Sequence, residues 1–179
     1  MNRKVFVSIH LYLAAFLTPI LLMIAISGGL YLLGFKGNLE SNVIYEGDLA
    51  GFEFNSDDRK SVVDKFLKEN NINLDYEYIK GGKNSFFTRP TSKTYLSFER
   101  KGNSLKVTQR KPDFIKSIVE LHKGHGPLLF KTLQKITAVG LILVLLTGFY
   151  LGLTSPSLKN KTLAISGAGG LIFILLAIF

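Results

Sequence analysis

Three long apolar stretches alternate with charged segments along the chain. The first runs from Val5 to Leu33, the second from Ile136 to Leu153 and the third from Leu163 to Phe179. Each is near or above the roughly 17–25 residues that a helix needs to cross the hydrocarbon of a bilayer. The first exceeds the ~7–15 apolar residues of a signal peptide, and no small-residue cleavage site ends it, so we expect it to stay in the mature protein. The pattern predicts three transmembrane helices.

The polar segment between the first two stretches has the pattern of a small folded domain. Residues 56–72 (SDDRKSVVDKFLKENNI) begin with capping residues and carry four apolar side chains on one helical face, as an amphipathic helix does. Pro112 opens a second predicted helix, DFIKSIVELHKG. The four segments between them alternate in polarity and are separated by turn residues, which predicts antiparallel strands. The face of the first helix comprises Val62, Val63, Phe66 and Leu67, and the strands are expected at 74–80, 85–90, 94–100 and 104–110.

These elements predict a membrane protein with three transmembrane α-helices and a small extracytoplasmic α+β domain, an antiparallel sheet with a helix. The expected boundaries follow from where the apolar stretches start and stop. They are 1–35 for the first transmembrane helix, 36–126 for the domain, 127–153 for the second helix, 154–162 for a cytoplasmic loop and 163–179 for the third helix.

Charge is distributed unevenly along the chain. All 13 acidic residues lie within residues 35–127, whereas Arg3, Lys4, Lys159 and Lys161 stand in short segments without any acid. The positive-inside rule assigns such segments to the cytoplasm, which places the N-terminus inside and residues 36–126 outside. The net charge of +9 then reflects insertion into membrane lipid, and it does not indicate a nucleic-acid partner.

The absence of cysteine narrows the chemistry that the chain can perform. Without cysteine there are no disulfides, thiolate metal sites, iron–sulfur clusters or thiol nucleophiles. No nucleophile–base pair of a hydrolase is recognisable either. The candidates that remain are the three histidines His10, His122 and His125.

His10 lies about one turn inside the first apolar stretch, where an unpaired imidazole costs free energy. Its partner could be a neighbouring backbone carbonyl, the membrane interface or a haem iron. On a helix, Ala14 and Gly28 share its face. A face of small residues lets a flat ligand or another helix approach closely.

His122 and His125 stand in LHKGHGP, immediately before the second apolar stretch. Their spacing would place them on adjacent parts of one face if the helix were unbroken, and Gly140 and Thr147 would then be in register with His122. The glycines and the proline of the motif put that continuity in question. Two histidines could share a metal ion, but no further zinc ligand follows nearby. Interfacial histidines without any ligand remain the alternative.

The order of these elements resembles the PepSY-associated transmembrane family. The resemblance rests on His10 followed by Ser27-Gly28, on the helix and strands of residues 56–110, and on Leu121-His122 followed by Thr147-Gly148. Ser27 stands where the pattern tends to have threonine, and larger relatives carry more spans and more than one extracytoplasmic domain. The resemblance implies a PepSY-like domain in the periplasm and a location in the bacterial inner membrane. Some members of that family are haem-bearing reductases of ferric siderophores, and others have no established role.

Haem b is the cofactor that this resemblance implies, with His10, His122 and His125 as the candidate iron ligands. His10 is expected on the other side of a ~30 Å hydrocarbon core from the other two, so one chain cannot bind the same iron with both. A two-fold homodimer would bring each histidine beside its own copy and hold two haems. We favour His122 over His125 because it occupies the Leu-His position of the family pattern. Lys131 and Lys135 are placed to pair with haem propionates.

Two functions from different classes are compatible with the sequence. The first is electron transfer from a cytoplasmic donor to ferric iron or a ferric siderophore on the outer side, a haem-dependent ferric reductase. The alternative is a non-catalytic accessory protein that regulates a peptidase or transporter through its PepSY-like domain. A visible absorption spectrum of the purified protein distinguishes them.

Overall fold

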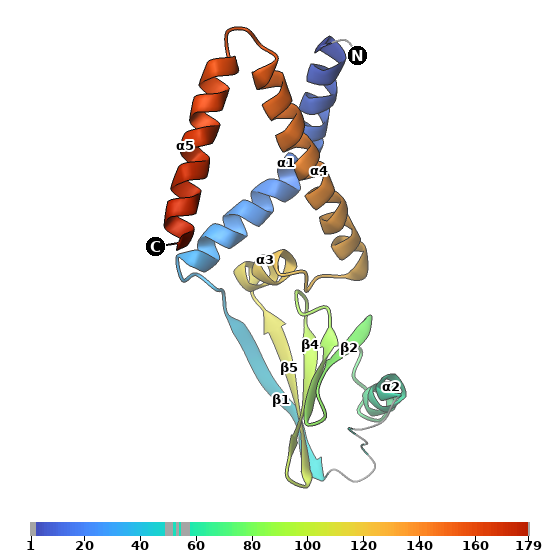
Figure 1. Ribbon diagram of the computed structural model, residues 1–179. Helices are drawn as coiled ribbons and strands as arrows, with labels where there is room; N and C mark the ends of the chain where they lie inside the picture. Colours follow the sequence, from blue (N-terminus) through green and yellow to red (C-terminus); the bar gives the residue numbers. More distant parts are fainter. Residues whose placement is uncertain (1–2, 49–51, 53, 55–57, 179) are drawn as a thin grey trace. The chain divides into compact units, whose positions relative to one another are not determined.

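The computed structural model describes residues 3–48, 52, 54 and 58–178, and by its internal contacts the chain divides into two compact units (Figure 1). One unit comprises Met1–Leu21 and Lys135–Phe179, and the other comprises Leu22–Gln134. The division falls inside two long helices, α1 (Arg3–Leu32) and α4 (Leu128–Leu153). Each unit therefore contains a part of both helices.

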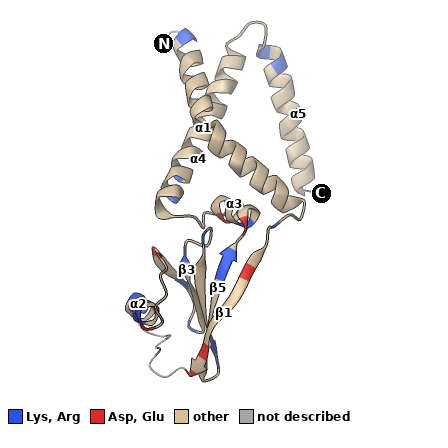
Figure 2. Ribbon diagram, turned by 180° about the vertical axis from the view of Figure 1, so that it is seen from behind, with Lys and Arg blue, Asp and Glu red and all other residues tan. Residues whose placement is uncertain are grey.

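Three helices are long and apolar enough to cross a membrane: α1, α4 and α5 (Lys159–Ile178). They contain 30, 26 and 20 residues. At about 1.5 Å per residue, each equals or exceeds a hydrocarbon core of about 30 Å. Their few charged side chains lie in the first two or three turns, and the remaining turns carry none (Figure 2). These features are those of a multi-pass membrane protein, as the apolar stretches predicted.

Glycines set how closely the helices of the first unit approach one another. A Cβ placed on Gly140 of α4 would lie 2.7 Å from Cδ1 of Leu17, which is 2% exposed on α1. A Cβ on Gly152 would lie 2.6 Å from the hydroxyl of Thr162, at the start of α5. Small residues at such positions let helix backbones pack closely where lipid offers no hydrophobic driving force for association.

The second unit contains a five-stranded antiparallel sheet in the order β1-β5-β4-β3-β2. The four strands expected from the sequence are present, although β2 is shorter than its segment. The strand β1 was not expected: it is an edge strand with mostly exposed side chains, and it forms by pairing along the whole of β5. The strands are β1 (Leu39–Asp48), β2 (Tyr78–Gly81), β3 (Ser85–Arg89), β4 (Tyr95–Lys101) and β5 (Ser104–Pro112).

The helix α2 (Arg59–Glu69) covers one side of the sheet and supplies part of its core (Figure 1). Three of the four apolar residues predicted to face inward are buried, and Val62 is half-exposed. The N-cap is Asp58, whose carboxylate accepts a hydrogen bond from the amide of Ser61 at 3.1 Å. The expected first capping residues, 56 and 57, lie outside the described residues. The buried members of the core are Phe54, Val63, Phe66, Leu67, Phe86, Leu96, Phe98, Leu105 and Val107.

The helix α3 (Phe114–His122) follows β5 and lies at the end of the sheet (Figure 1). The prediction that Pro112 opens it was wrong, because Pro112 is the last residue of β5 and Asp113 is the N-cap. The carboxylate of Asp113 accepts hydrogen bonds from the amides of Lys116 and Asn38, both at 2.7 Å. The pKa of Asp113 is lowered because these two amides stabilise its charged form.

A turn separates α3 from α4, so the two do not form one continuous helix. Gly124 adopts a φ of +72°, and its amide donates to the carbonyl of Leu121 at 2.9 Å. The carboxylate of Glu77 accepts from the amide of Leu128 at 2.8 Å, at the first residue of α4. The break removes the helical register that would have placed Gly140 and Thr147 on the face of His122.

Candidate functional site

His10 is held in the first unit by two consecutive residues of α4. Its Nδ1 lies 2.9 Å from the hydroxyl of Thr147, and a Cβ on Gly148 would lie 3.1 Å from its Cε1. The Thr147 hydroxyl donates its own proton to the carbonyl of Leu143 at 2.6 Å. Its oxygen is therefore left to accept a hydrogen bond from Nδ1–H of His10. We call His10, Thr147 and Gly148 the His10 bracket.

His122 is held in the second unit by the corresponding residues of α1. Its Nδ1 lies 2.9 Å from the carbonyl oxygen of Ile24 and 3.1 Å from the hydroxyl of Ser27. A Cβ on Gly28 would lie 3.0 Å from its Cε1. Ser27 is 1% exposed, and its hydroxyl donates to the same Ile24 carbonyl at 3.1 Å. We call His122, Ser27 and Gly28, with the Ile24 carbonyl, the His122 bracket.

The hydrogen bonds of the two brackets place the ring proton of each neutral imidazole on Nδ1. A carbonyl oxygen can only accept a hydrogen bond, so Nδ1 of His122 carries the ring proton. The Thr147 hydroxyl already donates its proton to a helix carbonyl, so Nδ1 of His10 carries the ring proton as well. When neutral, each ring then presents Nε2 as a lone-pair donor. Within the part of the chain that the structure describes, neither Nε2 has a hydrogen-bond partner. A neutral ring in this tautomer has a nitrogen that could ligate a metal.

His125 belongs to a different cluster from His122. Its Nδ1 donates to the Glu120 carboxylate at 2.7 Å, and the hydroxyl of Thr91 donates to the same carboxylate oxygen at 2.8 Å. Lys116 and Lys123 lie 3.7 and 3.6 Å from the other oxygen. Burial raises the pKa of Glu120, but the hydrogen bonds from His125 and Thr91 and the charges of His125 and Lys123 outweigh it, so that pKa is lowered.

The histidines do not gather into a metal site with other protein ligands. No group of three or more His, Asp or Glu side chains able to hold a metal ion occurs in residues 3–48, 52, 54 and 58–178. His122 and His125 hydrogen-bond to different elements, so the structure gives no support to an ion shared by the pair. The brackets provide single imidazoles.

The two lysines expected to pair with haem propionates, Lys131 and Lys135, differ in their contacts, and two further lysines lie near an aromatic ring. The ammonium of Lys131 donates to the hydroxyl of Tyr78 and lies 4.4 Å from the centre of that ring. Lys135 is exposed. On the same unit as Lys131, the ammonium groups of Lys36 and Lys123 lie 5.3 and 4.9 Å from the ring centre of Tyr31.

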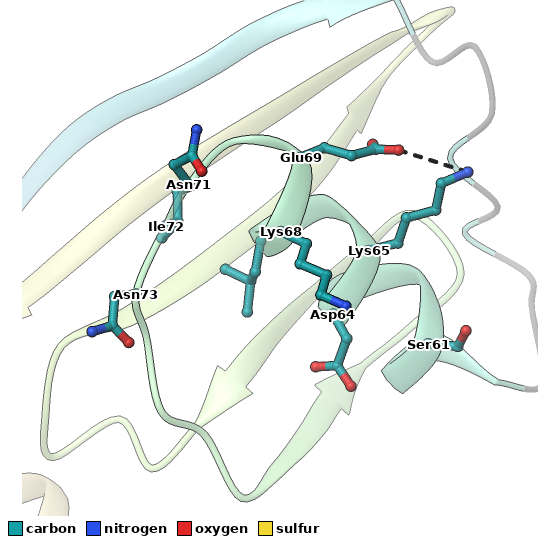
Figure 3. Close-up of a pocket in the computed structure, with 9 residues that line it drawn as sticks. Ser61, Asp64, Lys65, Lys68, Glu69, Asn71, Ile72 and Asn73 are labelled. Carbon is teal, nitrogen blue, oxygen red and sulfur yellow. Dashed lines mark ion pairs between the residues drawn. The ribbon is translucent and has the colours of Figure 1, made fainter.

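A hollow of about 850 Å³ beside α2 carries charged groups of both signs (Figure 3). Its lysines and carboxylates are solvated: the ion pair of Lys65 and Glu69 spans 3.8 Å, with side chains 70% and 62% exposed. Asp64 accepts a hydrogen bond from the hydroxyl of Tyr76 at 2.6 Å. Exposed pairs of this kind contribute little, and they give the hollow no converging set of groups.

Sequence reasoning identified the histidines and noticed both small-residue pairs, Ser27-Gly28 and Thr147-Gly148, but not which histidine each pair holds. His10 of α1 is held by Thr147-Gly148 of α4, and His122 of α3 by Ser27-Gly28 of α1, rather than each by the pair that follows it in sequence. Glu120 was missed altogether. Twice in the sequence a histidine is followed by a hydroxyl residue and a glycine. This repeat is the signal that could have suggested that each histidine contacts the pair following the other one.

No family model matches the chain, and neither a curated protein nor a solved structure matches it significantly. The two brackets are the features from which a function can be argued.

Proposed function

We propose that this chain is a haem-carrying electron-transfer protein of the PepSY-associated type, located in the bacterial inner membrane. It receives electrons from a cytoplasmic donor and reduces ferric iron or a ferric siderophore on the outer side. The observation that carries the proposal is the matched pair of brackets, in which His10 and His122 have Nδ1 hydrogen-bonded and Nε2 without a partner among the described residues.

The donor set of both brackets fits haem iron. Histidines that ligate metals almost always donate the other ring N–H to a fixed acceptor, which sets the tautomer and makes the ligating nitrogen more basic. Here the acceptors are the Thr147 hydroxyl for His10 and the Ile24 carbonyl with the Ser27 hydroxyl for His122. When bound, a haem with two imidazole ligands accepts and gives one electron without an open iron position.

The chain's own residues perform the positioning. Gly148 and Gly28 remove the Cβ that would push each ring away from its acceptor. The hydroxyls of Thr147 and Ser27 are committed to helix carbonyls, so each ring hydrogen bond keeps one polarity. A ring fixed in this way loses little conformational entropy when its Nε2 takes a ligand.

A homodimer supplies the second imidazole that each haem requires. One protomer offers a single bracketed histidine in each unit, and a two-fold axis places each residue near its own copy. Native mass spectrometry in mild detergent should show an even number of chains. A monomer that carries haem would contradict this arrangement and would leave Met23 or His125 as ligands to test.

Orientation in the membrane is part of the proposal, because it sets the direction of electron flow. The lysines and arginine of the acid-free segments favour a cytoplasmic N-terminus and a periplasmic α+β domain. Single cysteines can be introduced into the cysteine-free chain at Asn103 and Asn160. An impermeant thiol reagent should label the first in intact spheroplasts and not the second. The opposite pattern would reverse the orientation.

The visible spectrum of the purified protein tests the cofactor directly. A haem with two histidine ligands gives an intense Soret band, whereas the accessory-protein alternative predicts none. His10→Ala and His122→Ala should each remove about half of the haem, and undiminished ferric reduction by His10→Ala would exclude the transmembrane route. His125→Ala is the matched control, since it removes an imidazole from the same short segment but leaves both brackets intact. Full haem content in all three variants would overturn the ligand assignment.

A further inference from the structure

A cavity of about 230 Å³ lies in the α+β domain, and its lining residues include none of the bracket residues. It is formed where α3 and the turn after it meet the ends of β3 and β4. Basic and hydroxyl side chains dominate its polar lining, and Glu120 is its acidic member. The residues that line it are Leu39, Phe87, Arg89, Thr91, Tyr95, Lys116, Glu120 and His125.

Arg89 is the unusual member of this lining. It is 4% exposed, and no carboxylate pairs with it among the described residues. One terminal nitrogen, Nη1, donates to the Thr91 hydroxyl at 2.8 Å, and the guanidinium lies 4.8 Å from the ring centre of Phe87. Its Nε is buried and has no hydrogen-bond partner among the residues that the structure describes. A buried cation normally requires a direct counter-charge, because leaving water is costly for an unpaired charge.

Glu120 does not supply that counter-charge directly. Its carboxylate oxygens already accept from Thr91 and His125 and face Lys116 and Lys123. Arg89 reaches it only through the Thr91 hydroxyl, which donates to Glu120 at 2.8 Å. The cavity therefore holds two full positive charges, Arg89 and Lys116, against one carboxylate.

Tyr95 completes the polar wall on the side of the sheet. It pairs across the strands with Arg110, whose guanidinium lies 3.3 Å from Glu99. Burial raises the pKa of Tyr95, so its hydroxyl stays protonated and can donate a hydrogen bond to a ligand.

We propose that this cavity binds one oxyanion, the carboxylate or phosphate group of a ligand, against the Arg89 guanidinium that lines it. A guanidinium presents its N–H groups as a planar fork, a geometry that matches carboxylate and phosphate oxygens. Lys116 and the Tyr95 hydroxyl supply the further contacts. The volume suits a single small anion or the head of a larger molecule, because drug-sized ligands occupy about 300–1,000 Å³.

Two sources offer this chemistry, a soluble anion and the headgroup of an anionic phospholipid. His125 lines the cavity and lies three positions before Leu128, the first residue of a helix able to cross a membrane. The phosphate of a membrane lipid is therefore a second source of the same chemistry. The experiment separates the two sources by offering each alone.

The test measures binding to the full chain in neutral detergent, with and without haem. One arm titrates inorganic phosphate and citrate at constant ionic strength and follows the unfolding temperature. The other adds phosphatidylglycerol and follows lipid retention by native mass spectrometry. We expect saturable binding in at least one arm, weakened at least tenfold in Arg89→Lys, which keeps the charge but loses the planar fork. Arg100→Gln removes an exposed charge from the same domain and should bind as the unaltered chain does.

Lys116→Gln guards against a folding defect in the Arg89 variant. The Lys116 side chain is 24% exposed, and Glu120 keeps its three other partners without it. This variant should fold normally and bind several-fold more weakly. Absence of saturable binding in both arms, or equal binding by the unaltered chain and by Arg89→Lys and Lys116→Gln, would overturn the proposal. Because the haem content is measured separately, failure here leaves the proposed electron-transfer function untouched.

Discussion

Adjacent glycines of α1 offer a sharp test of the His122 bracket. A Cβ at Gly28 would lie 3.0 Å from Cε1 of His122, whereas a Cβ at Gly29 would meet nothing within 4 Å. Gly28→Ala and Gly29→Ala are therefore matched variants: both add one methyl group to the same turn of the same helix. Only the first should disturb the imidazole.

The expected difference follows from two opposing effects. Replacing glycine by alanine inside a helix stabilises it by about 1 kcal/mol, and Gly29→Ala should show this gain in full. At Gly28 the new Cβ lies about 0.5 Å inside an ordinary carbon contact of ~3.5–4.0 Å, so the ring must move. The hydrogen bond from His122 to the Ile24 carbonyl, 2.9 Å long, is then weakened, at a cost of about 1 kcal/mol. Gly28→Ala should thus be about 1 kcal/mol less stable than Gly29→Ala.

Two measurements report on this difference. Helix content followed by circular dichroism during denaturant titration in detergent micelles gives the free energy of unfolding of each variant without any cofactor. Haem titration of the same samples gives the affinity, which should fall about 10–100-fold in Gly28→Ala because the acceptor of the ligand's second nitrogen is displaced. Gly29→Ala should bind haem as the unaltered chain does.

Equal stabilities of the two variants would show that the glycine at 28 is not needed for the seating of the ring. Unequal stabilities with equal haem affinities would support the packing of Gly28 against His122 but would contradict the assignment of His122 as a haem ligand. The two readouts therefore separate the structural statement from the functional one.

Three further outcomes are expected. Thr137→Val should leave the stability unchanged or raise it by up to about 1 kcal/mol, because the Thr137 hydroxyl is buried and has no hydrogen-bond partner in the described part of the chain. A loss of stability in denaturant titration would contradict this. Folding lowers the pKa of Glu120, so this carboxylate stabilises the folded state above its ordinary pKa of 4.5, and that stabilisation is lost as the pH falls through the lower folded-state pKa. The free energy of unfolding, measured from pH 7 to 3, should therefore fall. The fall should be smaller in Glu120→Gln. Gly37→Ala should cost more stability than Gly34→Ala, by about 1–3 kcal/mol: both residues have positive φ, but only at Gly37 would a Cβ meet the backbone of Lys116. Similar unfolding curves for these two would show that the clash is relieved cheaply.

The membrane helices could be predicted because their signal is local. An uninterrupted apolar run is sufficient to place each, although the run of the second begins at Ile136 and α4 itself begins at Leu128. Lys131 and Lys135 dilute the first two turns, and the residue that fixes the true start is Glu77, which accepts from the amide of Leu128 across the fold. No local pattern contains that information.

The sheet was predictable where its strands contain buried side chains. The strands β3, β4 and β5 contain such side chains, and the alternation of polar and apolar residues is visible in their sequence. The strand β1 has exposed side chains over most of its length, and its pairing partner β5 lies far along the chain. Its hydrogen bonds, and not its side chains, determine that it is a strand.

The candidate site was predictable as a set of residues and not as a set of pairs. His10 could be identified because an imidazole within an apolar helix is unfavourable in free energy unless it has a partner. The hydrogen bond between His10 and Thr147 depends on how α1 and α4 cross. The imidazole of His122 reaches Ser27 because α3 ends at His122. These facts belong to tertiary packing.

The exchange between the brackets has a consequence for how the sequence can change over generations. Each bracket joins a residue of α1 to one that follows the sheet: His10 to Thr147, and His122 to Ser27. A lineage that loses one histidine no longer needs the glycine opposite it, and alanine, a better helix former, can then enter at little cost. Selection therefore acts on pairs of distant positions, so that 10 should vary with 148, and 28 with 122. The two couplings are nested along the chain, and each ties a position before the sheet to one after it, so a change in either half bears on a residue of the other half.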